Sequence, residues 1–157
     1  MNYKEIISSI TDKNLQPVYF LMGDEPYYID KVADAFSKDV LSAEEQEFNQ
    51  VVLYGKDIDT AQIIAESKQF PFGSEKRVVI IKEAQHLTDI EILDSYLDTV
   101  QPSTVLVICY IRLSFILRGS DIGKASTLFI KIILGLKTSN EFKCSSISSA
   151  AFFIKPQ

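Results

Sequence analysis

Gln69-Phe70-Pro71-Phe72-Gly73-Ser74-Glu75-Lys76-Arg77-Val78-Val79-Ile80-Ile81 is the stretch that decides the fold of this chain. Its last four residues form a continuous β-branched run, which is typical of a strand buried on both faces of a parallel sheet. Before the run, Pro71 fixes its own φ and favours an extended Phe70, and Gly73 permits a sharp turn after Phe72. We therefore expect a helix to end near Gln69 and a rigid apolar tip to precede the strand.

The two aromatic residues of this tip have two interpretations. Phe70 and Phe72 can fold back onto the core, as most large apolar side chains do. Alternatively, Phe72 projects as an anchor for a pocket on a partner protein. Aromatic side chains on a constrained loop supply a large contact area at a low entropic cost, which suits the second role.

The composition is that of a globular protein with one sizeable core. The chain has 157 residues, of which 46% are hydrophobic and 24% are charged. Residues 1–16 are polar with scattered Ile, so no signal peptide is expected, and no run of about 18 apolar residues suggests a membrane span. Cys109 and Cys144 lie too far apart for metal-ligand spacing, which favours a reduced, cytoplasmic compartment. Cys109 lies in an apolar run and is expected to be a buried thiol, and His86 is expected to be a surface residue rather than a base.

The net charge of −5 is distributed unevenly along the chain. Residues 1–110 carry nine Lys and Arg against 19 Asp and Glu, a net charge of −10. Residues 111–157 carry seven against two, a net charge of +5. The acidic first part disfavours binding to phosphate backbones by charge, so direct contact with nucleic acid is not expected there.

Residues 1–110 alternate between apolar runs and amphipathic segments. Strands are expected over residues 17–22, 51–54, 77–81 and 104–109, and helices over residues 3–10, 26–41, 58–69 and 88–99. Asp57 or Asp59 can cap the third helix, and Thr88 and Glu91 have the spacing of a capping box for the fourth, with Leu87 and Ile92 as a hydrophobic staple. Glu44 to Glu47 is interpreted as an acidic, solvated connector. The pattern predicts an α/β fold in three layers, with helices on both faces of a parallel sheet.

Two strand ends lack the residues that an ATP site needs. A phosphate-binding loop that began at Gly23 would place its second Gly, its Lys and its Ser or Thr at Tyr28, Ile29 and Asp30. After the third strand, Lys82 stands where an Asp would bind the metal ion, and Glu83 follows it. The pattern indicates a P-loop-like scaffold without a functional P-loop, and an unrelated α/β domain is the alternative. Tyr27 and Tyr28 are expected to pack within their helix rather than bind a ligand.

Four stretches carry a resemblance to a known family. Residues 17–26, Phe48-Asn49, residues 69–85 and residues 104–109 together resemble the delta subunit of the bacterial DNA polymerase III clamp loader. The resemblance implies an AAA+-like domain over residues 1–110 that binds the ring-shaped sliding clamp, the beta subunit, and helps to open it for loading onto DNA. In the family the clamp-binding element is the apolar pair before the third strand. By position this pair is Pro71 and Phe72, with Phe70 and Gly73 as supports.

The resemblance also implies what this domain does not do. It implies a part of the polymerase III holoenzyme with no catalysis of its own, no cofactor and no metal. Contact with DNA is expected only through the complex, and contact with a membrane is not expected. The other interpretations are a nucleotide-binding α/β enzyme and a truncated product with no function of its own.

Residues 111–157 differ in kind from the rest of the chain. The resemblance stops near Tyr110, whereas the family is more than twice as long and continues into a lid domain and a helical collar that assembles with other loader subunits. Without a collar, those subunits are not expected partners. The segment holds eight of the 16 serines and shows no clean period. One hypothesis is an out-of-frame tail after about codon 110, and the alternative is a divergent ending. A lysine-rich helical continuation in another reading frame would support the first hypothesis.

The AAA+ strand order gives this tail a structural consequence. In that order the first strand lies between the fourth strand and a fifth. Unless residues 111–157 supply the fifth, Val18 to Met22 forms an exposed apolar edge, and we expect a marginally stable fragment. The composition of Thr127 to Leu134 would suit such a strand.

Overall fold

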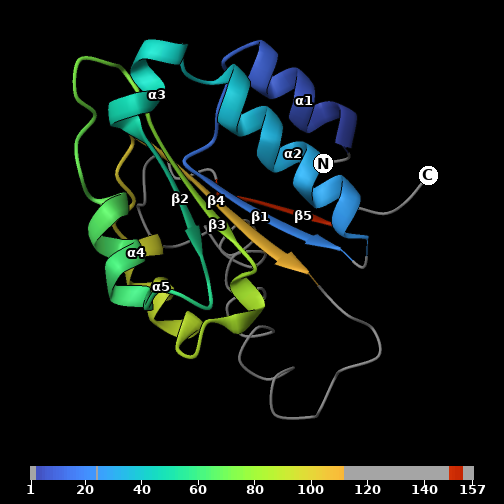
Figure 1. The fold of residues 1–157 in the computed structure, drawn as a ribbon, viewed down its shortest axis with the longest axis vertical. Helices are drawn as coiled ribbons and strands as arrows, with labels where there is room; N and C mark the ends of the chain where they lie inside the picture. The colour runs from blue at the N-terminus through green and yellow to red at the C-terminus, as the bar shows by residue number, and fades with distance from the viewer. Residues whose placement is uncertain (1–2, 24, 112–148, 154–157) are drawn as a thin grey trace, which may run out of the picture.

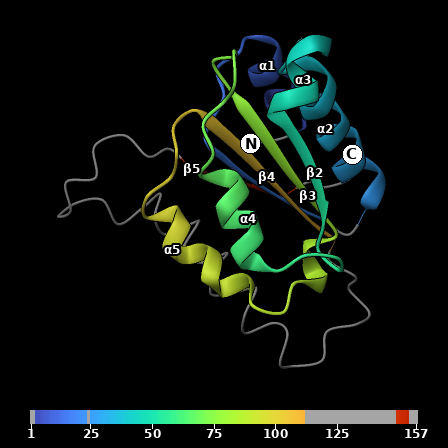
Figure 2. The same ribbon diagram turned by 60° about the vertical axis from the view of Figure 1, so that its left-hand side comes forward.

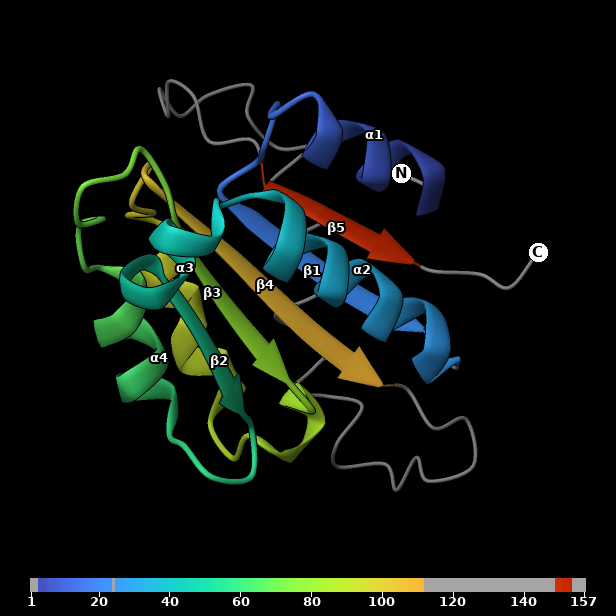
Figure 3. The same cartoon turned by 45° about the horizontal axis from the view of Figure 1, so that its top comes forward.

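A five-stranded parallel sheet lies at the centre of the computed structural model, which describes residues 3–23, 25–111 and 149–153 (Figure 1). The strands are β1 (Val18–Gly23), β2 (Gln50–Tyr54), β3 (Arg77–Lys82), β4 (Thr104–Ile111) and β5 (Ser149–Phe153). Their order across the sheet is β2-β3-β4-β1-β5, and every neighbouring pair is parallel. The expected parallel sheet is therefore confirmed, and Figure 3 shows the strands side by side in this order.

Helices cover both faces of the sheet, which confirms the three-layer arrangement. The α-helices are α1 (Tyr3–Thr11), α2 (Pro26–Asp39), α3 (Ala43–Asn49), α4 (Thr60–Ser67) and α5 (Leu93–Leu97), and two 3₁₀ turns, η1 (Ala84–His86) and η2 (Ile90–Ile92), precede α5. Figure 2 shows α1 and α2 on one side of the sheet and α4 and α5 on the other. The same picture places α3 near one end of the strands, beside the start of β3.

The alternation of side chains along β1 explains why its whole run is apolar. Tyr19 and Leu21 pack into the core beneath α1 and α2, whereas Val18 and Phe20 pack into the core beneath α4 and α5. All four side chains are fully buried. A strand between two helical layers has no solvated face, so it needs apolar residues at every position.

The first strand is not an edge strand. β5 pairs with β1 from Val18 opposite Ser149 to Met22 opposite Phe153. The expectation that β1 lies between β4 and a fifth strand is confirmed, and residues 149–153 form this fifth strand. Thr127 to Leu134, which we considered for this place, lies outside the described residues.

The interpretation of Glu44 to Glu47 as a connector is wrong, because these residues belong to α3. A capping box starts this helix: the Ser42 hydroxyl accepts from the Glu45 N–H, and the Glu45 carboxylate accepts from the Ser42 N–H at 2.9 Å. The backbone hydrogen bond from Ser42, followed by a bond from the Ser74 hydroxyl, lowers the pKa of Glu45. The segment has little apolar content, so it shows no hydrophobic periodicity that would predict a helix. The capping box is the local feature that favours the helix here.

The single helix expected over residues 88–99 is also wrong. The chain forms η1, η2 and the short α5 there, and no side chain caps η2 or α5. The Thr88 hydroxyl bonds to the Asp89 carboxylate instead of capping a helix, while the Asp89 carbonyl accepts from the Thr60 hydroxyl at 3.0 Å. Ile92 is exposed, so the expected staple does not form. By contrast, α4 has the expected Asp cap, which is Asp59 in a capping box with Gln62.

Candidate functional site

The loop between α4 and β3 carries two aromatic side chains into solvent. Phe70 is 78% exposed and Phe72 is 76% exposed. The interpretation in which they fold back onto the core is therefore wrong, and the projecting arrangement is the one observed. Gly73 has a φ of 65°, a left-handed conformation that confirms the expected turn, and α4 ends at Ser67, close to the expected position. Pro71, between the two aromatics, is half-buried.

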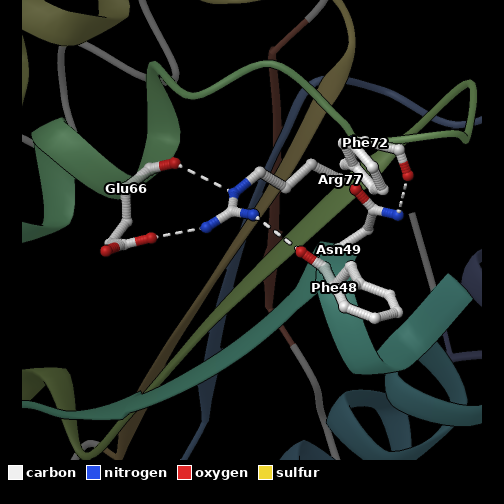
Figure 4. A network of polar contacts seen from close by, with 5 residues as sticks. All are labelled: Phe48, Asn49, Glu66, Phe72 and Arg77. Carbon is white, nitrogen blue, oxygen red and sulfur yellow. Dashed lines mark hydrogen bonds and ion pairs between the residues drawn. The ribbon is translucent and has the colours of Figure 1, made fainter.

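A buried amide holds the backbone of this loop. Asn49, the last residue of α3, is only 1% exposed. Its side-chain NH₂ donates to the Phe72 carbonyl at 2.8 Å, and its side-chain oxygen accepts from the Phe72 N–H at 2.6 Å. Figure 4 shows this pair of bonds, which joins the end of α3 to the tip of a loop 23 residues later. Asn49 therefore satisfies both polar groups of the Phe72 backbone.

A buried guanidinium ties together the elements on either side of the loop. Arg77, the first residue of β3, is 5% exposed. Its Nε donates to the Glu66 carbonyl at 3.2 Å, its Nη1 donates to the Phe48 carbonyl at 3.2 Å, and its Nη2 pairs with the Glu66 carboxylate (Figure 4). Glu66 lies in the last turn of α4 and Phe48 in the last turn of α3. One side chain thus binds carbonyls at the carboxyl ends of two helices, where helices leave such groups unpaired.

The exposed aromatic surface extends from the loop onto α3. Phe48 is 59% exposed, and its ring centroid lies 5.9 Å from that of Phe72 at a tilt of 54°. We refer to Phe48, Phe70 and Phe72 together as the aromatic tip. Exposed apolar side chains that cluster in this way, around a polar framework, are typical of protein interaction sites.

Sequence reasoning missed the parts of this site that lie far from the loop in the chain. Phe48, Asn49 and Arg77 lie within stretches that carry the family resemblance, but the sequence assigns none of them a role in the site. Their contacts span 11 to 29 residues, so no local period or motif reveals them. The one available signal was that Phe48-Asn49 is itself one of the stretches that carry the resemblance.

The residues that the sequence analysis assigned to a degenerate nucleotide site lie around the ends of β1 and β3. Gly23 ends β1, and Ile29 is buried in α2 rather than facing a ligand. The Lys82 ammonium lies 3.9 Å from the carboxylate of Asp30 and 3.9 Å from that of Asp34. Lys82, the last residue of β3, therefore lies beside two carboxylates of α2.

The side chains near these strand ends differ in burial. Glu83 adopts a left-handed backbone with φ 55° directly after Lys82. Tyr28 packs against the core beneath α2, as expected. Tyr27 is 58% exposed, and its ring lies edge-on against the ring of Tyr28. Among the residues that the structure describes, no group of three or more His, Cys, Asp or Glu is placed to hold a metal ion.

The remaining candidate groups are where the sequence predicted them. Cys109 is buried in β4, and desolvation raises the pKa of its thiol to about 12. Such a thiol is inert rather than nucleophilic. His86 is exposed in η1. Within the described part of the chain, no helix has the length and apolar character needed to cross a membrane.

Comparisons with known proteins agree with the fold. Residues 19–114 match the family described as DNA polymerase III, delta subunit. The DNA polymerase III subunit delta of Bacillus subtilis is 29% identical over 114 residues, which cover 66% of this chain and 33% of that protein. The chain thus spans about a third of the length of this curated relative.

Two solved structures resemble this one. The Bacillus subtilis DNA clamp loader delta protein superimposes with a TM-score of 0.63 at 27% identity, over 78% of this chain and 40% of that one. A DNA polymerase III gamma subunit-related protein from Thermotoga maritima has a TM-score of 0.52 at 12% identity, over 99% of this chain and 46% of its own length, and shows a shared fold alone. Because the family match over residues 19–114 covers more than half of the chain, with the whole loop that carries Phe70 and Phe72, this chain belongs to the DNA polymerase III delta-subunit family of clamp-loader proteins.

Proposed function

We propose that residues 1–110 of this chain bind the replicative sliding clamp through the aromatic tip and help to open the clamp ring for loading onto DNA. The observation that carries the proposal is the exposure of Phe70 and Phe72, about three quarters each, on a loop whose backbone is hydrogen-bonded to a buried side chain. Large aromatics are costly to leave in water, and a fixed loop that presents them suits a partner with an apolar pocket.

The binding energy would come from the transfer of Phe72 into such a pocket. An aromatic anchor at the centre of an interface contributes about 2 kcal/mol or more by alanine substitution. Pro71 and the turn at Gly73 restrict the loop before binding, which lowers the entropy lost on association. To open a ring, the tip must bind the distorted clamp more tightly than the closed one, because a ligand shifts an equilibrium only by its differential affinity.

The proposal assigns no ATP hydrolysis to this chain. Tyr28, Ile29 and Asp30 replace the phosphate-binding residues, and Lys82 is paired with Asp30 and Asp34. We therefore expect no thermal shift on addition of ATP and magnesium, since a ligand that binds the native state must stabilise it. A clear nucleotide-dependent shift would favour the nucleotide-binding α/β enzyme instead. The same proposal makes contact with DNA indirect.

Binding to the sliding clamp tests the proposal directly. The affinity of the 157-residue chain is compared with that of Phe72→Ala and of a control, Tyr27→Ala. Tyr27 is an exposed aromatic at the start of α2, beyond the carboxyl end of β1, whereas the tip precedes β3. We expect Phe72→Ala to lose affinity about 30-fold, the equivalent of about 2 kcal/mol, and Tyr27→Ala to bind as the parent does. A folded parent that does not bind the clamp, or equal losses in the two variants, would refute the proposal.

A further inference from the structure

Asn49 has contacts that its place in a helix does not require. Its side chain is buried, yet its amide donates to and accepts from the backbone of Phe72, a residue whose own ring is in solvent. We propose that Asn49 is a positioning residue, which holds Phe72 in the orientation that binds the clamp. The inference rests on the proposed function and deepens it.

The loop needs such a contact because its aromatic side chains cannot hold it. A loop is usually ordered by burying its apolar residues, whereas Phe70 and Phe72 remain exposed. Without another restraint, the backbone would sample many conformations, each of which points Phe72 in a different direction. A primary amide offers a donor and an acceptor side by side, so Asn49 can bind the N–H and the carbonyl of one residue together.

Asn49 is itself held in place from both sides along the chain. The preceding residue, Phe48, has its carbonyl bound by the Arg77 guanidinium. The following residue, Gln50, starts β2 and pairs with Val78 in the sheet. The amide therefore projects from a fixed point between α3 and β2, and the orientation of Phe72 is set relative to the sheet.

The expected effect on binding follows from the fraction of molecules with a competent loop. The apparent dissociation constant equals the intrinsic value divided by that fraction. If Asn49→Ala leaves about one molecule in ten with Phe72 in the bound orientation, the affinity falls about tenfold, which corresponds to about 1.4 kcal/mol. A positioning residue acts only through the group that it positions, so its effect must disappear when the Phe72 ring is absent.

A double-mutant cycle tests this dependence. Clamp affinity is measured for the 157-residue parent, Asn49→Ala, Phe72→Ala and the double variant, with Gln69→Ala as a control because Gln69 has an exposed amide in the same loop. We expect Asn49→Ala to cost about tenfold in the parent and less than about twofold in the Phe72→Ala background. Equal losses in both backgrounds, no loss in either, or a similar loss in Gln69→Ala would overturn the inference.

Amide hydrogen exchange gives a readout that does not require the clamp. The measurement on the parent also does not depend on whether any variant folds. In the parent, the Phe72 N–H is bound by Asn49 and should exchange more slowly than the N–H of its exposed neighbour Phe70. In Asn49→Ala, exchange at Phe72 should accelerate while amides of β3 and β4 remain protected. A Phe72 amide that exchanges as fast as that of Phe70 in the parent refutes the positioning role, even where the clamp is bound. A slow Phe72 amide in a chain that does not bind the clamp refutes the proposed function instead.

Discussion

Replacing Arg77 with Met should destabilise the domain strongly. The guanidinium is buried and bonds to the Phe48 carbonyl, the Glu66 carbonyl and the Glu66 carboxylate. The two carbonyls lie in the last turns of α3 and α4, where cationic donors are also favoured by the helix dipole. Met fills a similar volume but leaves all three acceptors without this donor.

The size of the effect can be worked from these contacts. Hydrogen bonds from a charged group contribute about 1.5–3 kcal/mol each, against which stands the desolvation of the guanidinium. Breaking a buried ion pair costs about 3–5 kcal/mol. The Glu66 side chain is 32% exposed and can turn towards water, so we expect the lower limit, about 3 kcal/mol. Arg77→Lys retains the charge but cannot reach both helix ends, and should cost about 2 kcal/mol.

Urea unfolding of the parent and the variants measures these differences. Lys68→Met is the control, because it removes an exposed cation close to the same helix end and should change the free energy of unfolding by less than about 0.5 kcal/mol. In thermal unfolding, Arg77→Met should lower the midpoint by about 6–12 °C for a chain of this length. A loss below about 1 kcal/mol for Arg77→Met, or an equal loss for Lys68→Met, would show that the guanidinium does not support the two helix ends.

Three further predictions concern the loop, the buried thiol and the edge of the sheet. Gly73→Val should weaken clamp binding, because a β-branched residue is strained at a φ of 65°, whereas Gly73→Asn tolerates this conformation and should bind more nearly as the parent does; equal binding by the two variants would contradict this. In a Cys144→Ser background, Cys109 should react with a thiol reagent at pH 8 only after unfolding, since burial raises the thiol pKa to about 12 and leaves almost no thiolate; rapid reaction of the native protein would show that the site is open. A chain ending at residue 148 lacks β5 and exposes the β1 edge, so its urea midpoint should fall and light scattering should show aggregation. An unchanged midpoint would mean that β5 adds nothing to stability.

The sheet was predictable from the sequence because its strands are buried on both faces. A continuous apolar run such as Val78 to Ile81 is typical of that environment whatever lies elsewhere in the chain. The turn at Gly73 was predictable for a similar reason, since Pro restricts the local backbone to one φ and Gly permits a positive φ. In both cases the residues that carry the signal are the residues that adopt the structure.

The two capping-box patterns show where local reasoning fails. Ser42 to Glu45 and Thr88 to Glu91 have the same spacing, and we expected a helix only at the second, where apolar residues follow. The structure has the capped helix at Ser42 instead. At the second, the Asp89 carbonyl bonds to the Thr60 hydroxyl of α4, and Thr88 turns to the Asp89 side chain. The Thr88 hydroxyl therefore bonds to a neighbouring side chain in place of a cap, and a contact across 29 residues holds the adjacent backbone.

The candidate site could be predicted only in part, for a reason that follows from its proposed function. Phe70 and Phe72 are recognisable as a tip, but a surface that must stay exposed to bind a partner cannot be ordered by burying its own aromatic residues. Its order has to come from polar groups elsewhere in the chain that bind the loop backbone and the helix ends around it. In this structure those groups are the Asn49 amide and the Arg77 guanidinium, and both residues are buried. Hydrophobic periodicity does not report such residues. A search for buried polar side chains whose partners are backbone groups beside exposed aromatics would find this site, and it would apply equally to other loops that present an apolar anchor.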